Sequence, residues 1–214
     1  MSDPSATSFR MRGAWAAALL VPSGLLALFS HPHTHPGTWE RTSVVVLSWT
    51  CFLPGAVLRL WSTLYIGRRK SREVVCEGPY SICRNPLYVG SFLLWLSAGL
   101  LLESPPFLAA VLLSAVGYGL WVVPKEERFL GEAFGEEYRR YLQEVPRFLP
   151  RFSLLKEPEV IQVHTRGIRH EWKRAVFWLW MPVLGRILYQ FRWQPWWPHL
   201  PTAWERLSGL WIHA

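Results

Sequence analysis

Cysteine and lysine are both scarce in this chain of 214 residues. The three cysteines, Cys51, Cys76 and Cys83, are too few for a disulfide framework, and none has the close neighbour that a zinc knuckle needs. We therefore expect free thiols in a reducing compartment. Arginine far outnumbers lysine, a bias that favours a bacterial source with a GC-rich genome.

A complete set of metal ligands is also lacking. His31, His33 and His35 lie at alternate positions, but no carboxylate or cysteine stands beside them. Because a zinc site usually draws on four ligands of these kinds, we predict a short loop outside the cytoplasm and no metal site.

Apolar residues, in contrast, are abundant. Half of the chain is hydrophobic, and it contains 14 Trp and 11 Phe. The net charge of +8 would suit nucleic acid, but the basic residues collect between apolar runs instead of forming a continuous basic pattern. This distribution is typical of a membrane protein and argues against nucleic acid as a partner.

Four apolar runs cover residues 13–29, 44–61, 87–102 and 106–123. Each is close to the roughly 20 residues that cross the hydrocarbon core of a bilayer. No small-x-small cleavage site follows Leu28, so the first run is interpreted as a retained span and not as a signal peptide. Only three residues, 103–105, separate the last two runs, which predicts a tight helical hairpin.

The distribution of lysine and arginine predicts the orientation. The connection 30–43 holds only Arg41, and the hairpin turn holds no basic residue. The basic residues before the first run and after the second and fourth runs are Arg10, Arg12, Arg68, Arg69, Lys70, Arg72, Arg84, Lys125, Arg128, Arg139, Arg140, Arg147 and Arg151. We predict a multi-pass protein of the bacterial inner membrane, with its N-terminus and both long basic segments in the cytoplasm.

The C-terminal part is less regular. Residues 175–191 are apolar and aromatic, but Arg186 falls among them, and a central arginine costs about 2.5–3.5 kcal/mol on insertion scales. The tryptophans that follow, at 193, 196 and 197, suit a headgroup boundary. We favour an interfacial or re-entrant helix here and leave a fifth span open.

The predicted fold class is therefore all-α. We expect a polytopic membrane helical bundle of four transmembrane helices, with a C-terminal cytoplasmic amphipathic helix and the aromatic helix, interfacial or spanning. Residues 1–154 would form the membrane-embedded domain, and residues 155–214 would form an aromatic-rich, membrane-associated extension.

The first segment with candidate chemistry is 67–90. Gly78-Pro79 indicates a turn, Asn85 suits an N-cap, and Pro86 suits the first position of the third span. We expect Cys76 and Cys83 to be accessible to thiol reagents from the cytoplasm.

The second candidate segment is 125–150. Apolar residues recur every three or four positions, which predicts an amphipathic helix that continues the fourth span. Glu126 and Glu127 lie where this helix leaves the bilayer. Because carboxylates at membrane depth usually have partners, we expect Arg84 or a bound ligand beside them.

Together the two segments resemble the isoprenylcysteine carboxyl methyltransferases and their relatives, the phospholipid N-methyltransferases. Those proteins carry G-P-Y, then R-H-P-x-Y-x-G, a hairpin, two glutamates and F-G-x-x-Y-x-x-Y-x-x-x-V-x-R-x-x-P. The matching residues are Gly78, Pro79, Tyr80, Arg84, Asn85, Pro86, Leu87, Tyr88, Val89, Gly90, Glu126, Glu127, Phe134, Gly135, Tyr138, Tyr141, Val145, Arg147 and Pro150. The resemblance covers roughly residues 44–152, and Asn85 departs from it because the family has histidine there.

The resemblance implies S-adenosylmethionine (SAM) as the cofactor, bound between the cytoplasmic loop, the inner end of the hairpin and the C-terminal helix. The implied cofactor-binding residues are Gly78, Tyr80, Arg84, Pro86, Tyr88, Gly90, Glu126, Glu127, Tyr138 and Tyr141. The implied catalytic residues are Arg84, Asn85, Glu127 and Arg147. Gly78 and Gly90 would let the backbone approach the ligand closely. Asn85 cannot take a proton at neutral pH, so any role that needs an imidazole is lost.

The expected function is methyl transfer to a lipophilic or lipidated acceptor that arrives from the bilayer among the membrane lipids. A carboxylate acceptor is favoured over an amine, because it needs no general base. Two alternatives stay open. One is an NADPH-dependent membrane lipid reductase, which the small number of spans disfavours. The other is a non-catalytic membrane scaffold or lipid-binding protein, which Asn85 favours.

Overall fold

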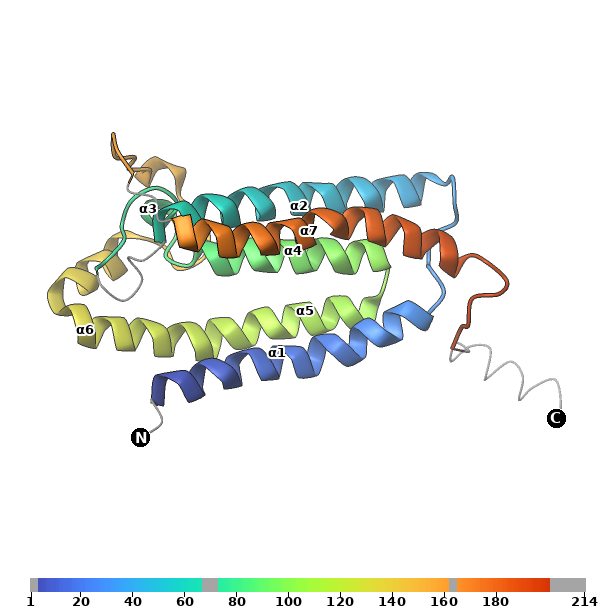
Figure 1. Ribbon diagram of the computed structural model, residues 1–214, viewed down its shortest axis with the longest axis horizontal. Helices are drawn as coiled ribbons and strands as arrows, with labels where there is room; N and C mark the ends of the chain where they lie inside the picture. Colours follow the sequence, from blue (N-terminus) through green and yellow to red (C-terminus); the bar gives the residue numbers. More distant parts are fainter. Residues whose placement is uncertain (1–3, 67–72, 162–164, 201–214) are drawn as a thin grey trace.

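The computed structural model describes residues 4–66, 73–161 and 165–200, with side chains from residue 13 and, after 161, from residue 173. Within these ranges the regular structure is entirely helical: α1 Pro4–Phe29, α2 Trp39–Ile66, α3 Pro79–Ile82, α4 Pro86–Leu102, α5 Pro105–Gly117, η1 Tyr118–Val122, α6 Val123–Glu144, η2 Phe152–Leu154 and α7 Thr165–Arg192. Helices α1, α2, α4, α5 and α7 run side by side along the bundle (Figure 1). Arg68, Arg69, Lys70 and Arg72 lie outside the described residues, as do the side chains of Arg10 and Arg12.

Helices α2 and α4 form the closest pair in the bundle. Gly55 and Gly90 face each other where the helices meet, because a Cβ atom on Gly90 would lie 2.9 Å from the Gly55 carbonyl oxygen. Farther along, the buried hydroxyls of Ser48 and Ser97 share a hydrogen bond of 3.0 Å. Small residues therefore let the two backbones approach closely, as is common between helices in membranes.

The predicted hairpin between residues 102 and 106 is confirmed. Helix α4 ends at Leu102 and is followed by Glu103, whose φ of 48° lies in the left-handed region, and the Ser104 side chain caps α5. The Glu103 carboxylate accepts hydrogen bonds from Arg41 Nη1 at 2.6 Å and from the Thr34 hydroxyl at 2.6 Å. This end of the bundle, called the hairpin end below, is thus tied to the connection between α1 and α2.

Large apolar side chains cover much of the bundle's outer surface. Those with more than half of their area exposed include Val21, Leu25, Val46, Leu47, Leu53, Val57, Leu112, Leu113, Val116, Leu120, Trp121, Phe177, Leu179 and Trp180. Two helical stretches, Trp39–Ile66 and Pro105–Glu144, are long and apolar enough to cross a membrane, and Gly13–Phe29 and Pro86–Leu102 are shorter apolar helices. Such a surface suits hydrocarbon and would be unfavourable in water.

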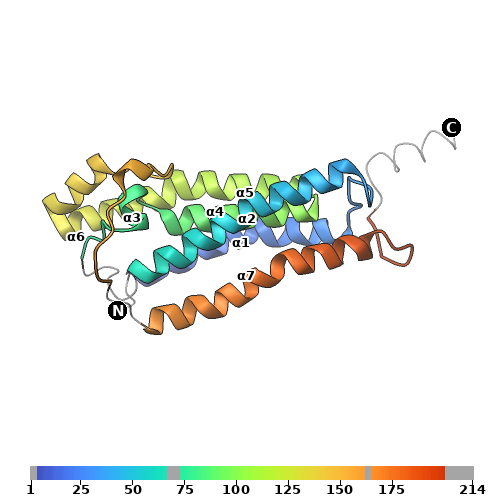
Figure 2. The same ribbon diagram turned by 90° about the horizontal axis from the view of Figure 1, so that it is seen from above.

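Helix α7 lies lengthwise along α2 and α4, from the end of the bundle that carries α3 to the hairpin end (Figures 1 and 2). Helix α7 is not among the described helices that are long and apolar enough to cross a membrane, so the choice between an interfacial helix and a fifth span stays a prediction. Arg192 anchors α7: this fully buried guanidinium donates to the Ser30 carbonyl at 2.9 Å and to the Leu102 carbonyl at 2.6 Å. Arg186, which had argued against a span, is exposed on the outer surface.

The amphipathic helix does continue the fourth apolar run, as predicted. Helix α5 passes through a π-helical turn, Tyr118–Val122, into α6. Pro124 follows this turn and lacks the N–H that a regular α-helix would use there, which accounts for the local rearrangement. The helix breaks at Gly135, whose φ of 57° and ψ of −126° are not helical. The second half of α6 thereby turns back toward α3, at the end called the α3 end below (Figure 1).

Candidate functional site

Two segments that are distant in sequence lie against each other at the α3 end. The Arg84 N–H donates to the Pro146 carbonyl at 2.9 Å, and the Arg151 N–H donates to the Ile82 carbonyl at 2.9 Å. Farther along, the Gly78 N–H donates to the Lys156 carbonyl at 2.7 Å. These backbone bonds hold residues 78–85 beside residues 146–156, so the two predicted chemical segments form one structure.

Glu127 connects the two segments through its carboxylate. Its Oε1 atom lies 3.0 Å from Arg84 Nη1, while Arg147 donates from Nε at 3.2 Å and from Nη2 at 2.6 Å. The Glu127 and Arg84 side chains are only 10% and 13% exposed, whereas Arg147 is 41% exposed. Both carboxylate oxygens are therefore engaged by arginines, and a bidentate contact of this kind also fixes the guanidinium plane.

Glu126, the neighbouring carboxylate, points to a different partner. It accepts a hydrogen bond of 2.9 Å from the Tyr88 hydroxyl of α4. The Tyr88 ring in turn packs against Tyr118 of the π-helical turn, with 5.4 Å between centroids. Glu127 thus pairs with arginines, whereas Glu126 accepts a hydrogen bond from a tyrosine.

Tyr141 and Tyr138 join α6 to α3. The Tyr141 hydroxyl donates to the Tyr80 carbonyl at 2.8 Å, and both tyrosines of α6 belong to a buried cluster with Val74 and Val145. Tyr138 lies close enough to the ion pairs of Glu127 for their charges to act on it. These side chains close the α3 end by packing and by one hydrogen bond, and their contact with a cofactor stays a prediction.

Two buried polar atoms at this site have no hydrogen-bond partner among the described residues: the Tyr80 hydroxyl and Arg84 Nε. Burial raises the pKa of Tyr80 far above its ordinary value, and the nearby Glu126 carboxylate raises it further. Tyr80 is therefore a neutral donor at physiological pH. Because buried donors are rarely left unsatisfied, these two atoms suit contacts with a bound polar group.

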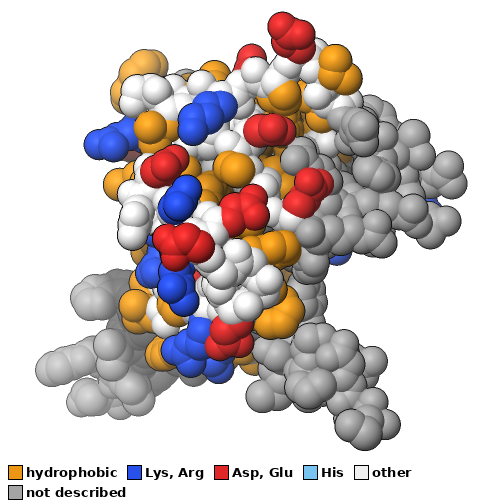
Figure 3. All heavy atoms as spheres, turned by 90° about the vertical axis from the view of Figure 1, so that its left-hand side faces the viewer, with side chains coloured by type: hydrophobic (Ala, Val, Ile, Leu, Met, Phe, Trp, Pro, Cys, Tyr) orange, Lys and Arg blue, Asp and Glu red, His pale blue; other side chains and the backbone are white. Residues whose placement is uncertain are grey.

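The end of the molecule that carries this site mixes acidic and basic side chains with apolar ones (Figure 3). The pairs at its surface, such as Arg139 with Glu136 at 3.7 Å, are largely exposed. Exposed pairs contribute only about 0–1 kcal/mol, so the buried contacts of Glu127 dominate the local electrostatics.

Gly78 and Gly90 have other reasons to be glycine than the predicted approach to a ligand. A Cβ atom on Gly78 would lie 2.3 Å from the Tyr65 ring, and its φ of 55° is unfavourable for other residues. A Cβ atom on Gly90 would lie 2.8 Å from Arg59 Cγ on α2. On the Cβ side the close neighbours of both residues are therefore protein, and the approach of their backbones to a ligand stays a prediction. Pro86 is buried at the first position of α4, which confirms the predicted helix start.

Comparison with known proteins supports a single family. The sequence profile described as phospholipid methyltransferase matches residues 43–137. The chain is 34% identical to cobalt-zinc-cadmium resistance protein CzcN of Cupriavidus metallidurans, over 80% of this chain and 78% of that protein. It is 32% identical to nickel-cobalt-cadmium resistance protein NccN of Alcaligenes xylosoxydans xylosoxydans, over 87% and 86%. A third relative is protein-S-isoprenylcysteine O-methyltransferase B of Arabidopsis thaliana, at 28% identity over 64% and 73%.

The chain belongs to the phospholipid methyltransferase family. It is a membrane protein with isoprenylcysteine methyltransferases among its relatives, as the motifs of the two segments predict. No solved structure shows a significant match to the chain. Helix α7 lies outside the residues that match the family profile.

Asn85, which stands where the family motif has histidine, has a defined contact in this member of the family. It occupies the N-cap position of α4, but its side chain does not cap the helix. Its Nδ2 atom instead donates to the Arg147 carbonyl at 3.1 Å. The side-chain amide therefore positions the backbone that carries one of the two site arginines.

Cys83 is fully buried, so the expected accessibility to thiol reagents is wrong for this residue. Its thiol donates to the Phe148 carbonyl at 3.2 Å, and burial raises its pKa to about 11. Cys76 is half-buried. The burial of Cys83 follows from the pairing of residues 78–85 with 146–156, which hydropathy does not predict.

Sequence reasoning identified the arginines and the glutamates but missed how they combine. It expected Arg84 or a bound ligand beside the glutamates, and Arg84 is confirmed as a partner of Glu127. It expected Arg147 to be catalytic and did not pair it with Glu127. It assigned no contact to Arg59. In the structure Arg59 Nη1 donates to the Ser91 hydroxyl of α4. The position of this arginine in an apolar helix was the sequence signal for such a contact, because charged residues in apolar helices usually have partners.

Proposed function

We propose that this protein is a SAM-dependent methyltransferase that modifies a lipophilic, membrane-borne acceptor at the cytoplasmic face. The observation that carries the proposal is the two-arginine network of Glu127, with the unpartnered Tyr80 hydroxyl and Arg84 Nε beside it. Membership in a methyltransferase family supports the reaction type.

The residues present fit the polar groups of SAM. Arg84, with a buried Nε that lacks a partner among the described residues, would hold the carboxylate, and the Tyr80 hydroxyl would donate to an acceptor atom. Glu126 and Tyr88 would face a cationic group. Glu127 would act as a positioning residue, because its oxygens already accept from both arginines. When bound, SAM would supply an electrophilic methyl group on a sulfonium.

A carboxylate acceptor suits these residues better than an amine. A carboxylate arrives as a nucleophile, so none of the site residues has to remove a proton, and Asn85 cannot do so. Arg147 would hold the acceptor, since its guanidinium is the more exposed of the two and keeps a fixed plane through Glu127. The contribution of this chain to the rate is then alignment, which is worth up to about 7–11 kcal/mol in favourable cases.

For the topology, we propose that α1, α2, α4 and α5 cross the inner membrane of a bacterium, with the N-terminus and the α3 end in the cytoplasm. Helix α7 would be a fifth span because it lies along the bundle and exposes apolar side chains. Residues 1–154 would hold the methyltransferase site, and residues 155–214 would add the extension. The apolar outer surface would bring the acceptor and lipids to the site laterally.

Calorimetry with the purified full-length protein in detergent tests the proposal, with SAM and NADPH titrated in parallel. We expect saturable binding of SAM that the demethylated product displaces, and loss of this binding in Arg84→Ala. Binding of NADPH alone would assign the protein to the reductases. Absence of both would favour the non-catalytic scaffold.

A further inference from the structure

A cavity of about 400 Å³ lies between α2, α4 and α7, on the side of the bundle and apart from the Glu127 network. It is lined by Arg59, Ser91, Trp95, Lys173, Arg174, Phe177 and Trp178. Three of these residues are cations and three are aromatic, and none of the described lining residues is acidic. Four of the seven belong to α7, which the family profile does not cover.

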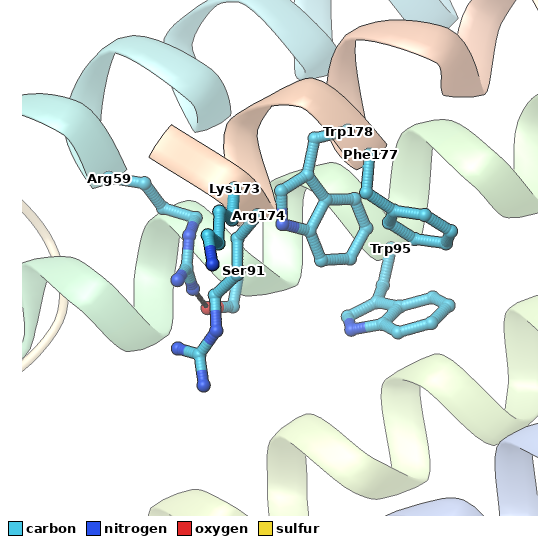
Figure 4. A pocket seen from close by; sticks show the side chains of 7 residues that line it. All are labelled: Arg59, Ser91, Trp95, Lys173, Arg174, Phe177 and Trp178. Atoms are coloured by element: carbon cyan, nitrogen blue, oxygen red, sulfur yellow. Dashed lines mark hydrogen bonds between the residues drawn. The ribbon is translucent and has the colours of Figure 1, made fainter. Parts of the chain in front are cut away.

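The lining is divided by chemistry. Arg59, Lys173 and Arg174 gather with Ser91 on one side, while the rings of Trp95, Phe177 and Trp178 lie on the other (Figure 4). The Trp95 and Trp178 rings meet edge to face with 5.2 Å between centroids, and Phe177 packs on Trp178 at 5.6 Å. The apolar half is thus a wall of rings that support one another.

The positions of the polar and the aromatic lining residues agree with the orientation of the bundle in the bilayer proposed above. On α4, Ser91 lies one turn from the α3 end, and Trp95 lies about 6 Å deeper at 1.5 Å per residue. On α7, which runs inward from the same end, Lys173 and Arg174 precede Phe177 and Trp178. Both helices therefore place their polar lining residues, Ser91 on α4 and the two cations on α7, toward the α3 end and their rings toward the middle of the bundle.

We infer that this cavity binds the phosphate-bearing headgroup of an anionic phospholipid in the cytoplasmic leaflet. The three cations match the phosphate, and basic pockets between transmembrane helices are a known physical solution for anionic headgroups. The rings would contact the upper part of an acyl chain. The site is independent of the cofactor, so it does not require that the proposed methyl transfer be correct.

Native mass spectrometry of the full-length protein in detergent tests the inference, without SAM. Dioleoyl phosphatidylglycerol and dioleoyl phosphatidylcholine are added in turn at equal concentration, and glycerol 3-phosphate serves as the phosphate without acyl chains. We expect phosphatidylglycerol to be retained roughly tenfold better than phosphatidylcholine, and glycerol 3-phosphate to compete weakly. Equal retention of the two lipids would overturn the site, and equally tight binding of glycerol 3-phosphate would make it a free-phosphate site.

Two double variants test whether the lipid binds in this cavity. Lys173→Gln/Arg174→Gln should lose the preference for phosphatidylglycerol, and both side chains are exposed enough to replace without unfolding the bundle. Lys125→Gln/Arg128→Gln is the matched control, because it removes the same charge from exposed positions on α6. Loss of the preference in both variants, or in neither, would overturn the assignment to this cavity. A thermal melt of each variant confirms that it is folded.

Discussion

Glu127 and Arg147 lie 20 residues apart in the sequence and meet through two hydrogen bonds, of 3.2 Å from Nε and 2.6 Å from Nη2. The break of α6 at Gly135 lies between them and makes the meeting possible, because a straight helix would carry Arg147 away. Arg84 Nη1 lies 3.0 Å from Oε1 of the same carboxylate, so Glu127 sets the position of two guanidinium groups.

Replacing Glu127 should therefore disturb both arginines at once. Glu127→Ala is expected to lower SAM affinity at least tenfold, about 1.4 kcal/mol, and the free energy of unfolding by about 1–3 kcal/mol, because charged hydrogen bonds are lost. Calorimetry and thermal melts measure the two effects. Glu136→Ala is the control: its carboxylate is 66% exposed and pairs with arginines only at the surface. Unchanged SAM affinity in folded Glu127→Ala would contradict the site.

Asn85 is expected to act through its side-chain donor. Asn85→Ala removes the hydrogen bond to the Arg147 carbonyl and should weaken SAM binding several-fold, whereas Asn85→His should retain most of it because imidazole can also donate. SAM titrations of the two variants measure the difference. Equal loss in both would show that the amide itself is required. No loss in either would remove Asn85 from the site.

Cys83 should resist thiol reagents in the folded protein. Its side chain is fully buried and its raised pKa, about 11, keeps it a neutral thiol at pH 7–9, where the thiolate is the reactive form. The half-buried Cys76 should react under the same conditions. Mass spectrometry after maleimide labelling at pH 7, 8 and 9 makes the comparison, with Cys83→Ser to assign the label. Rapid labelling of Cys83 before denaturation would mean that residues 78–85 do not stay paired with 146–156.

Position 90 should not accept a larger side chain, because α2 lies directly against it. This holds whether or not a ligand is bound. Gly90→Ala would place Cβ 2.8 Å from Arg59 Cγ and 2.9 Å from the Gly55 carbonyl oxygen, which should destabilise the bundle by about 1–3 kcal/mol. Gly131→Ala, on α6 with its nearest neighbour at 4.0 Å, is expected to be neutral or slightly stabilising. Denaturation of both variants without SAM is the measurement. Equal stabilities would contradict the close approach of α2 and α4.

The sequence by itself determined the helical class, the four apolar runs, the hairpin, the start of α4 at Pro86 and the family motifs. These features are local: hydropathy, turn residues and helix caps act over a few neighbouring positions, so they are visible without tertiary contacts. Only the tertiary structure decided the rest. It placed α7 along the bundle, since burial of Arg192 against the Ser30 and Leu102 carbonyls depends on residues far from it in sequence. It also buried Cys83, gave Gly78 and Gly90 packing roles, and brought Arg147 to Glu127, because each of these outcomes depends on which distant segments meet.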